Sequence, residues 1–346
     1  MRLAPSPEQT AFAAALHDLL SAAGVPEAAA RWAEGDHRPG RRIWSQLAEV
    51  GVTGLAVPVR WGGLGAGPAD LVVAAEELGH HALPGPVAES LAAVPTLLAA
   101  PAAPDGPDRP TTPDGPAPAE TGESALAGKW LPELATGRVL ATLAAPPWLP
   151  YATDADVAEL VLLADRDAVG EGRPGAARPS MDRTRRLYEV SPAGPPATCP
   201  AIGHALDLGA LIAAAQLLGA GRALLEAAVA HARTRVQFGG PIGRFQAVQH
   251  RLADVAVGLE FARPLLYAAA VTRSPRDISA AKVACAEAAN RAARAALQVH
   301  GAIGYTEEHG LGLWLTKVRV LSLAWGTPAE HRARVLAELT EGCSWN

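Results

Sequence analysis

The chain has 346 residues, of which 49% are hydrophobic and 19% are charged, and its formal net charge is −5. A chain of this length and composition can bury the cores of two or three domains, and disorder is not its dominant state. The slightly acidic balance argues against nucleic acid as a partner, because phosphate binding needs a concentrated basic face.

The chain contains three cysteines, Cys199, Cys285 and Cys343. None is spaced as in a C-x-x-C metal site, so no metal site is predicted and we expect reduced thiols in a cytoplasmic protein. The N-terminus lacks an apolar run followed by a small-residue cleavage site, so no secretory signal is predicted. Charges or prolines interrupt the apolar stretches, and we expect no membrane span.

The N-terminal third has the periodicity of helices. Apolar residues recur every three or four positions over residues 8–23, 40–50, 68–80 and 86–98. Trp61-Gly-Gly-Leu-Gly65 is interpreted as a turn between two of these helices. No strand precedes it and the G-x-G-x-x-G spacing is absent, so it is not a dinucleotide-binding loop.

The middle of the chain changes character. Residues 101–124 are dense in Pro, Gly, Asp and Thr, which predicts a flexible surface loop. Short apolar or β-branched runs over 139–144, 159–164 and 186–190 predict strands.

Long apolar helices are predicted in the C-terminal half, over residues 208–235, 245–272 and 278–299. A shorter one over 328–341 closes the chain. Their Ala- and Leu-rich faces favour an antiparallel four-helix bundle with short connections.

Three segments carry a resemblance to a known family. Residues 233–254, RTRVQFGGPIGRFQAVQHRLAD, resemble the segment that acyl-CoA dehydrogenases place between two long helices of their C-terminal domain. Residues 298–307, QVHGAIGYTE, are similar to the second flavin-contacting segment of that family, and Trp325-Gly326-Thr327 follows. Near the N-terminus, residues 47–65 and Glu76-Glu77-Leu78-Gly79 resemble its opening helical domain.

The resemblance implies a mostly α fold with a small β part. We expect a helical domain over 1–137, a shortened middle β-domain over 138–200 and a helical bundle with flavin-contacting segments over 201–346. After their first strand, family members usually carry a Thr-Glu dipeptide and a Gly-Ser-Asp turn that contact the flavin and the thioester. This chain instead has Ala144-Ala-Pro-Pro-Trp148.

The first flavin-contacting segment supplies four candidate residues. By resemblance, Arg235 contacts the FAD pyrophosphate of a neighbouring subunit, with Gln237 and Phe238 packing beside the cofactor and Gln246 adding a hydrogen bond. Arginine suits this role because its planar donors bind phosphate oxygens in pairs.

The second segment supplies three more, and Thr327 adds a fourth. Gln298 and Gly301 are expected at the pyrophosphate, and Ala302 adds a methyl group where relatives commonly have a second glycine. Thr327 is expected near the flavin. It also fits an N-cap, because proline follows it at the first helical position.

The family's catalytic carboxylate is missing from both of its usual places. Trp325 replaces the Glu of the common Glu-Gly-Thr arrangement, and the helix-borne alternative falls on Gly209. An indole cannot accept the α-proton of an acyl thioester. Asp207 lies about 200° round the same helix from Gly209. Glu307 and Glu308 remain as weak candidates for a relocated base.

We therefore expect an acyl-CoA dehydrogenase-like flavoprotein that uses FAD for α,β-dehydrogenation of an acyl-CoA or acyl-carrier thioester. The first hypothesis is a subunit without its own base that completes an FAD site with a homologous, Glu-bearing partner. The alternatives are a self-sufficient enzyme of lipid or secondary metabolism with a relocated base, or a non-enzymatic scaffold. The resemblance also implies an oligomer and leaves an electron-transfer protein as a partner.

Overall fold

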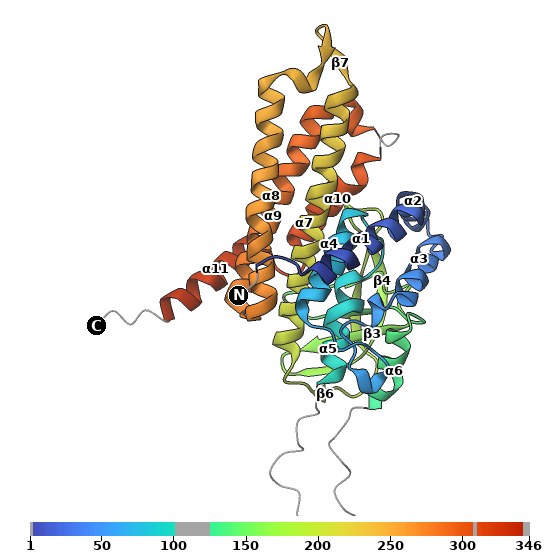
Figure 1. Ribbon diagram of the computed structural model, residues 1–346. Coiled ribbons are helices and arrows are strands. Elements are labelled where there is room, and N and C mark those ends of the chain that lie inside the picture. The colour runs from blue at the N-terminus through green and yellow to red at the C-terminus, as the bar shows by residue number, and fades with distance from the viewer. Residues whose placement is uncertain (1–2, 101–124, 307–309, 342–346) are drawn as a thin grey trace, which may run out of the picture.

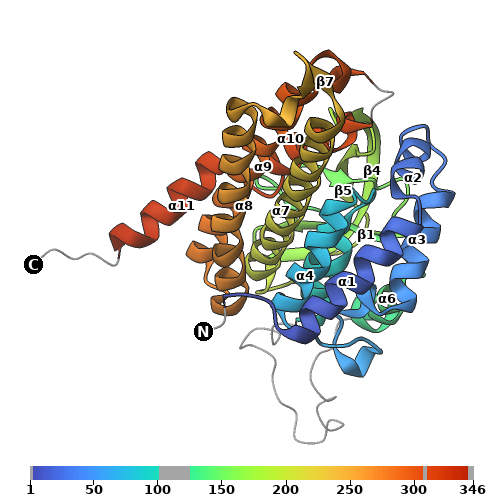
Figure 2. The ribbon, with the colours of Figure 1, turned by 45° about the horizontal axis from the view of Figure 1, so that its top comes forward.

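The computed structural model describes residues 3–100, 125–306 and 310–341. Figures 1 and 2 show a helical N-terminal part and a small sheet gathered beside one end of a long helical bundle, whose other end projects beyond them. The predicted loop over 101–124 lies outside the described residues.

The N-terminal part consists of α1 (Pro7–Ala22), α2 (Val25–Ala33), α3 (Arg38–Glu49), α4 (Pro68–His80), the π-helical turn η3 (Glu89–Ala93) with α5 (Val94–Ala99), and α6 (Ala125–Ala135). A capping box begins α1: the Ser6 hydroxyl accepts from the Gln9 amide N–H at 3.2 Å, and the Gln9 side chain accepts from the Ser6 amide at 2.9 Å. The predicted helices are present, and α2 was not predicted.

The sheet has six strands: β1 (Ala141–Ala144), β2 (Ala152–Thr153), β3 (Leu160–Asp165), β4 (Ala168–Pro179), β5 (Arg186–Pro192) and β6 (Ala197–Thr198). The order is β1-β3-β4-β5-β2, with β6 paired to β4. β1 and β3 are parallel, with Ala141 opposite Leu160, and the other pairs are antiparallel. All of β1 is buried, because this strand at one end of the strand order packs against η3 and α5.

The C-terminal part is the expected helical bundle. Its members are α7 (Ile202–Thr234), α8 (Gln246–Thr272), α9 (Pro275–His300), α10 (Leu311–Leu323) and α11 (Pro328–Glu341). α9 packs against α7, α8 and α11, while α10 packs on α7 and α9. α11 extends away from the long helices (Figure 1). The short hairpin of β7 (Val236–Gln237) and β8 (Gly240–Pro241) lies at the projecting end.

Two of these helices, α7 and α8, are long and apolar enough to cross a membrane by length and composition. The apolar window of α7 is 89% buried inside the protein, as expected for the central helix of a bundle. The window of α8 is only 39% buried, so much of its apolar surface lies outside the core.

The N-terminal part meets the bundle where α4 crosses α7. A Cβ atom added to Gly219 of α7 would lie 1.8 Å from the Glu76 carbonyl oxygen, and one added to Gly79 of α4 would lie 2.2 Å from the Gln216 carbonyl oxygen. The two backbones are therefore in direct contact, which only glycine permits at these positions. Beside the crossing, Arg222 donates to the buried carboxylates of Glu76 and Glu77 at 2.9 and 2.8 Å.

Gly219→Ala should lower the free energy of unfolding by about 2–3 kcal/mol, because its methyl group has to push the two backbones apart. Chemical denaturation measures the change. The matched control is Gly203→Ala on the same helix, whose Cβ meets no described atom within 4 Å. Equal effects of the two substitutions would show that the crossing is not tight.

Candidate active site and cofactor segments

Trp325 lies in the tight connection between α10 and α11. Its φ of +59° is unusual for a bulky residue, and Gly326 follows at +89°. Two side chains hold the connection. The Lys282 ammonium donates to the carbonyls of Leu321, Ser322 and Gly326 at 3.0–3.3 Å. The His331 Nε2 lies 2.8 Å from the Trp325 carbonyl oxygen. The indole is thus fixed in a buried position, with 4% of the residue exposed.

The Trp325 ring packs directly on Gly209. A Cβ atom at Gly209 would lie 2.1 Å from Cζ3 of the indole and 2.5 Å from Cη2. Positions 325 and 209 are therefore in contact. By the sequence resemblance, these are the two positions at which relatives carry a base. The missing side chain at one position makes room for the large side chain at the other.

The space beside Trp325 is small. The cavity there measures about 30 Å³ and is lined by all three parts of the fold, including Leu83, Thr153, Gln216 and Lys317. This volume holds roughly one water molecule, far less than an acyl thioester needs. Trp148, from the segment after β1, closes the far side of the connection: a Cβ at Gly326 would lie 2.7 Å from its ring.

Buried carboxylates that no sequence motif indicated line this small cavity. Burial raises the pKa of Glu89, against the opposing effects of Arg185 and a hydrogen bond with Thr153. Burial also raises the pKa of Asp154 to about 7. Glu89 stands in the π-helical turn η3, a distortion that is common at functional sites.

A buried ion pair also lines the cavity beside Trp325. Lys317 of α10 lies 3.0 Å from Asp182, and the Lys317 ammonium also donates to the Thr184 hydroxyl at 2.9 Å. Burial raises the pKa of Asp182, but the charge of Lys317 and hydrogen bonds from Thr184 outweigh it, and the pKa is lowered overall. The pair ties α10 to the connection between β4 and β5.

Asp207, the carboxylate nearest in sequence to Gly209, does not line this cavity. Asp207 is paired with Arg334 of α11, whose Nη2 donates to its Oδ2 at 3.1 Å. Glu307 and Glu308 lie outside the described residues. Among the described carboxylates, Glu89, Asp154 and Asp182 line the space next to Trp325.

The first predicted cofactor segment is an exposed hairpin. Arg235 ends α7, Gln237 lies in β7, and Phe238 forms the turn with Gly239, both at positive φ. Phe238 is 85% exposed, and Arg235, Gln237 and Gln246 are also exposed. Arg244 fixes the turn by donating to the Phe238 and Gly239 carbonyls. The hairpin presents these side chains outward.

The second predicted segment lines an open cleft of about 730 Å³ between α8 and α9. Gln298, Gly301 and Ala302 lie on this cleft, and Gly301 has φ +62° with open space where a Cβ would be. Ala302 is not at positive φ, so its methyl group causes no backbone strain. The cleft also holds three arginines that no sequence motif indicated, namely Arg251, Arg291 and Arg294, which outnumber its one carboxylate, Asp254.

These groups fit a bound diphosphate. Guanidinium groups bind phosphate oxygens through paired hydrogen bonds, and a glycine backbone without a side chain allows close approach. Stacking of His231 on His300, with ring centroids 4.3 Å apart, brings the end of α7 next to the end of α9. Both predicted cofactor segments therefore lie at the same end of the bundle.

Thr327 forms the N-cap of α11. Its hydroxyl accepts from the Glu330 amide at 3.3 Å, while the Glu330 carboxylate accepts from the Thr327 amide at 2.7 Å. This capping box accounts for Thr327 without a cofactor.

Comparison with known proteins agrees with this geometry. The family model of the acyl-CoA dehydrogenase C-terminal domain matches residues 199–340, and that of the N-terminal domain matches residues 6–103. The acyl-CoA dehydrogenase IpdE2 of Mycobacterium tuberculosis is 32% identical over 302 residues, which cover 86% of this chain and 87% of that protein. The chain belongs to the acyl-CoA dehydrogenase family. Members of this family are FAD-dependent oxidoreductases that act on CH–CH bonds of acyl-CoA.

Solved structures share the fold. A glutaryl-coenzyme A dehydrogenase in complex with glutaryl-CoA has a TM-score of 0.80 at 20% identity, covering 100% of this chain and 98% of that one. The ChsE4-ChsE5 complex from M. tuberculosis has a TM-score of 0.77 at 21% identity, covering 99% of this chain and 100% of that one. At these identities the likeness concerns the fold, and it confirms the predicted fold class.

The contact between Gly209 and Trp325 is testable by a double-mutant cycle. Gly209→Ala should lower the free energy of unfolding by about 2–3 kcal/mol in the natural chain, because its Cβ overlaps the indole. In a Trp325→Leu background, the same change should cost about 1 kcal/mol or less. Chemical denaturation of the four proteins gives the coupling energy, and a coupling near zero would contradict the contact.

Proposed function

We propose that this chain is the base-lacking subunit of a heteromeric acyl-CoA dehydrogenase and that it completes the FAD site of a Glu-bearing partner. The observation that carries the proposal is the packing of Trp325 on Gly209. The Trp325 indole occupies the position expected for the base. The cavity left beside it measures about 30 Å³, which is too small for the thioester that would have to bind there.

The cofactor segments support a role across an interface. When bound, FAD supplies the two-electron oxidation of the acyl chain. In this chain, Arg235, Gln237, Phe238 and Gln246 are exposed on or beside a projecting hairpin, where they can contact a cofactor held by another subunit. The three arginines of the cleft and Gln298 would hold a diphosphate.

An apolar line on α8 supports a partner subunit. Val257, Phe261 and Leu265 are spaced four residues apart, so they lie on one face of the helix, and they are 52%, 73% and 46% exposed. Exposed apolar faces of this kind mark protein–protein contacts. Two similar structures are named as pairs, the ChsE4-ChsE5 complex and the Tcur3481-Tcur3483 steroid acyl-CoA dehydrogenase, which supports a homologous subunit as the occupant.

Anaerobic titration tests the proposal. The chain is purified alone with added FAD and, separately, after co-expression with a longer homologue that carries the Glu-Gly-Thr arrangement. Short, medium and steroid-like acyl-CoAs are added while flavin absorbance is followed. We expect bleaching only in the complex, because the chain alone has neither a base nor room for the thioester at Trp325.

Two variants serve as controls. Phe261→Asp should abolish co-purification, because it places a charge in the apolar face, whereas Glu260→Gln beside it should not. Arg294→Gln should weaken FAD binding by the complex without dissociating it. Bleaching by the isolated chain, or failure of every Glu-bearing homologue to form a complex, would overturn the proposal.

One observation favours the self-sufficient alternative, namely the buried Glu89 on the same cavity as Trp325. A raised pKa suits a proton-transferring carboxylate. If the isolated chain bleaches flavin with an acyl-CoA, Glu89→Gln should abolish that activity while FAD binding persists. Retained turnover in this variant would leave Glu307 and Glu308 as the remaining candidates from the sequence.

A further inference from the structure

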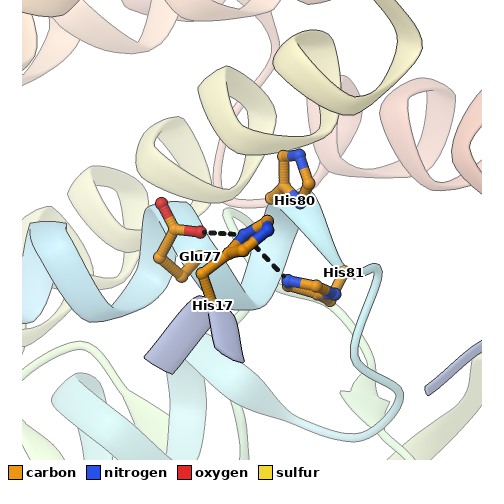
Figure 3. A group of neighbouring side chains, drawn as sticks. All are labelled: His17, Glu77, His80 and His81. Atoms are coloured by element: carbon orange, nitrogen blue, oxygen red, sulfur yellow. Dashed lines mark hydrogen bonds and ion pairs between the residues drawn. The ribbon is translucent and has the colours of Figure 1, made fainter. Parts of the chain in front are cut away.

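Three imidazoles and a carboxylate gather where α1 crosses the C-terminal end of α4. Glu77, His80 and His81 follow one another at i, i+3 and i+4, so they share one face of the helix end, and His17 of α1 lies over them (Figure 3). One donor atom from each of the four residues lies within 4.8 Å of the others.

The spacing matches a small coordination sphere. His17 Nδ1 lies 3.2 Å from Glu77 Oε2 and 3.2 Å from His81 Nε2. Ligands bound tetrahedrally at roughly 2.0–2.1 Å from zinc stand about 3.3 Å apart. The ring centroids of His17, His80 and His81 are 4.8–5.0 Å apart, so each ring is a direct neighbour of the other two. Small side-chain rotations would bring the fourth atom into range.

The neighbours orient the cluster as metal ligands are usually oriented. His80 is buried, and its Nε2 is paired with Glu226 Oε2 of α7 at 2.9 Å. Its Nδ1 is buried and has no hydrogen-bond partner in the described part of the chain. A histidine that donates one ring nitrogen to a carboxylate and offers the other to a cation is a common arrangement in metal sites.

Glu77 is held in a similar way. Its Oε1 accepts from Arg222 at 2.8 Å, which leaves Oε2 facing His17. The charges around the site favour a cation. Three carboxylates, Glu76, Glu77 and Glu226, stand against the two guanidinium groups of Arg222 and Arg263, a balance of −1 before any imidazole is counted.

The ligands are accessible from solvent. The His17 side chain is 41% exposed, and Glu77 and Glu226 also line a cavity of about 440 Å³ between α1, α4, α7 and α8.

We propose that His17, Glu77, His80 and His81 form a binding site for a divalent transition-metal cation of the Zn²⁺ class. Imidazole nitrogens and one carboxylate oxygen suit Zn²⁺ or Co²⁺ and disfavour Mg²⁺ and Ca²⁺, which require oxygen ligands. A bound ion would join α1 to α4 and, through Glu226, to α7. The site is thus a structural cross-link between the first helix and the bundle.

The test uses the full chain without a polyhistidine tag, titrated with Zn²⁺ in competition with a chromogenic chelator. We expect one tightly bound Zn²⁺ per chain and no competition from Mg²⁺. His17→Ala and His81→Ala should each weaken Zn²⁺ binding at least about ten-fold. His204→Ala, which removes an exposed histidine from the start of α7, should leave it unchanged.

Two further measurements guard against misfolding of the variants. Far-UV circular dichroism checks that each variant keeps its helices. Co²⁺ added to the natural chain should give the visible absorption of tetrahedral nitrogen and oxygen ligands, and His17→Ala should remove it. No stoichiometric Zn²⁺ binding, or equal binding by a folded His17→Ala chain, would show that the cluster is only a hydrogen-bonded group and would overturn the proposal.

Discussion

The contact between the backbones of α4 and α7 fixes the relation of the N-terminal helices to the bundle. Gly79 and Gly219 allow the close approach, and Arg222 then reaches the buried carboxylates of α4. The same end of α4 is also held by Trp314 of α10, whose indole N–H donates to the His80 carbonyl at 2.7 Å. The residues that follow directly after α4 form one wall of the cavity beside Trp325. The position of that wall therefore depends on the same contact.

Much of the fold could be predicted from helical periodicity and family motifs. α4 spans the predicted residues, and the long helices of the bundle are within a few residues of prediction. α10 was missed because Leu311–Leu323 is rich in apolar residues without a clear helical period, and its buried cation Lys317 is stabilised by partners distant in sequence, Asp182 and Thr184. β4 was missed because its prolines and glycines are typical of loops, and pairing with its neighbours overrides that preference.

The candidate site was predictable as a set of positions but not as an arrangement. The sequence identified Trp325 and Gly209 separately, yet their contact depends on how the end of α10 meets α7. Glu89 carries no motif, and only the fold brings it to the same cavity. The arginines of the cleft lie on two different helices, and no spacing links them. His17 is likewise far in sequence from Glu77, His80 and His81, so no short pattern reveals that cluster.

The packing of Trp325 on Gly209 also limits how this lineage can change. A carboxylate placed at position 209 would collide with the indole of Trp325, whose backbone carbonyl and that of Gly326 are held by His331 and Lys282. A glutamate restored at position 325 would leave a void against a glycine that has no side chain to fill it. Neither single substitution is favourable, so a carboxylate at one position requires the other position to change with it. The two positions are therefore coupled by epistasis within the core.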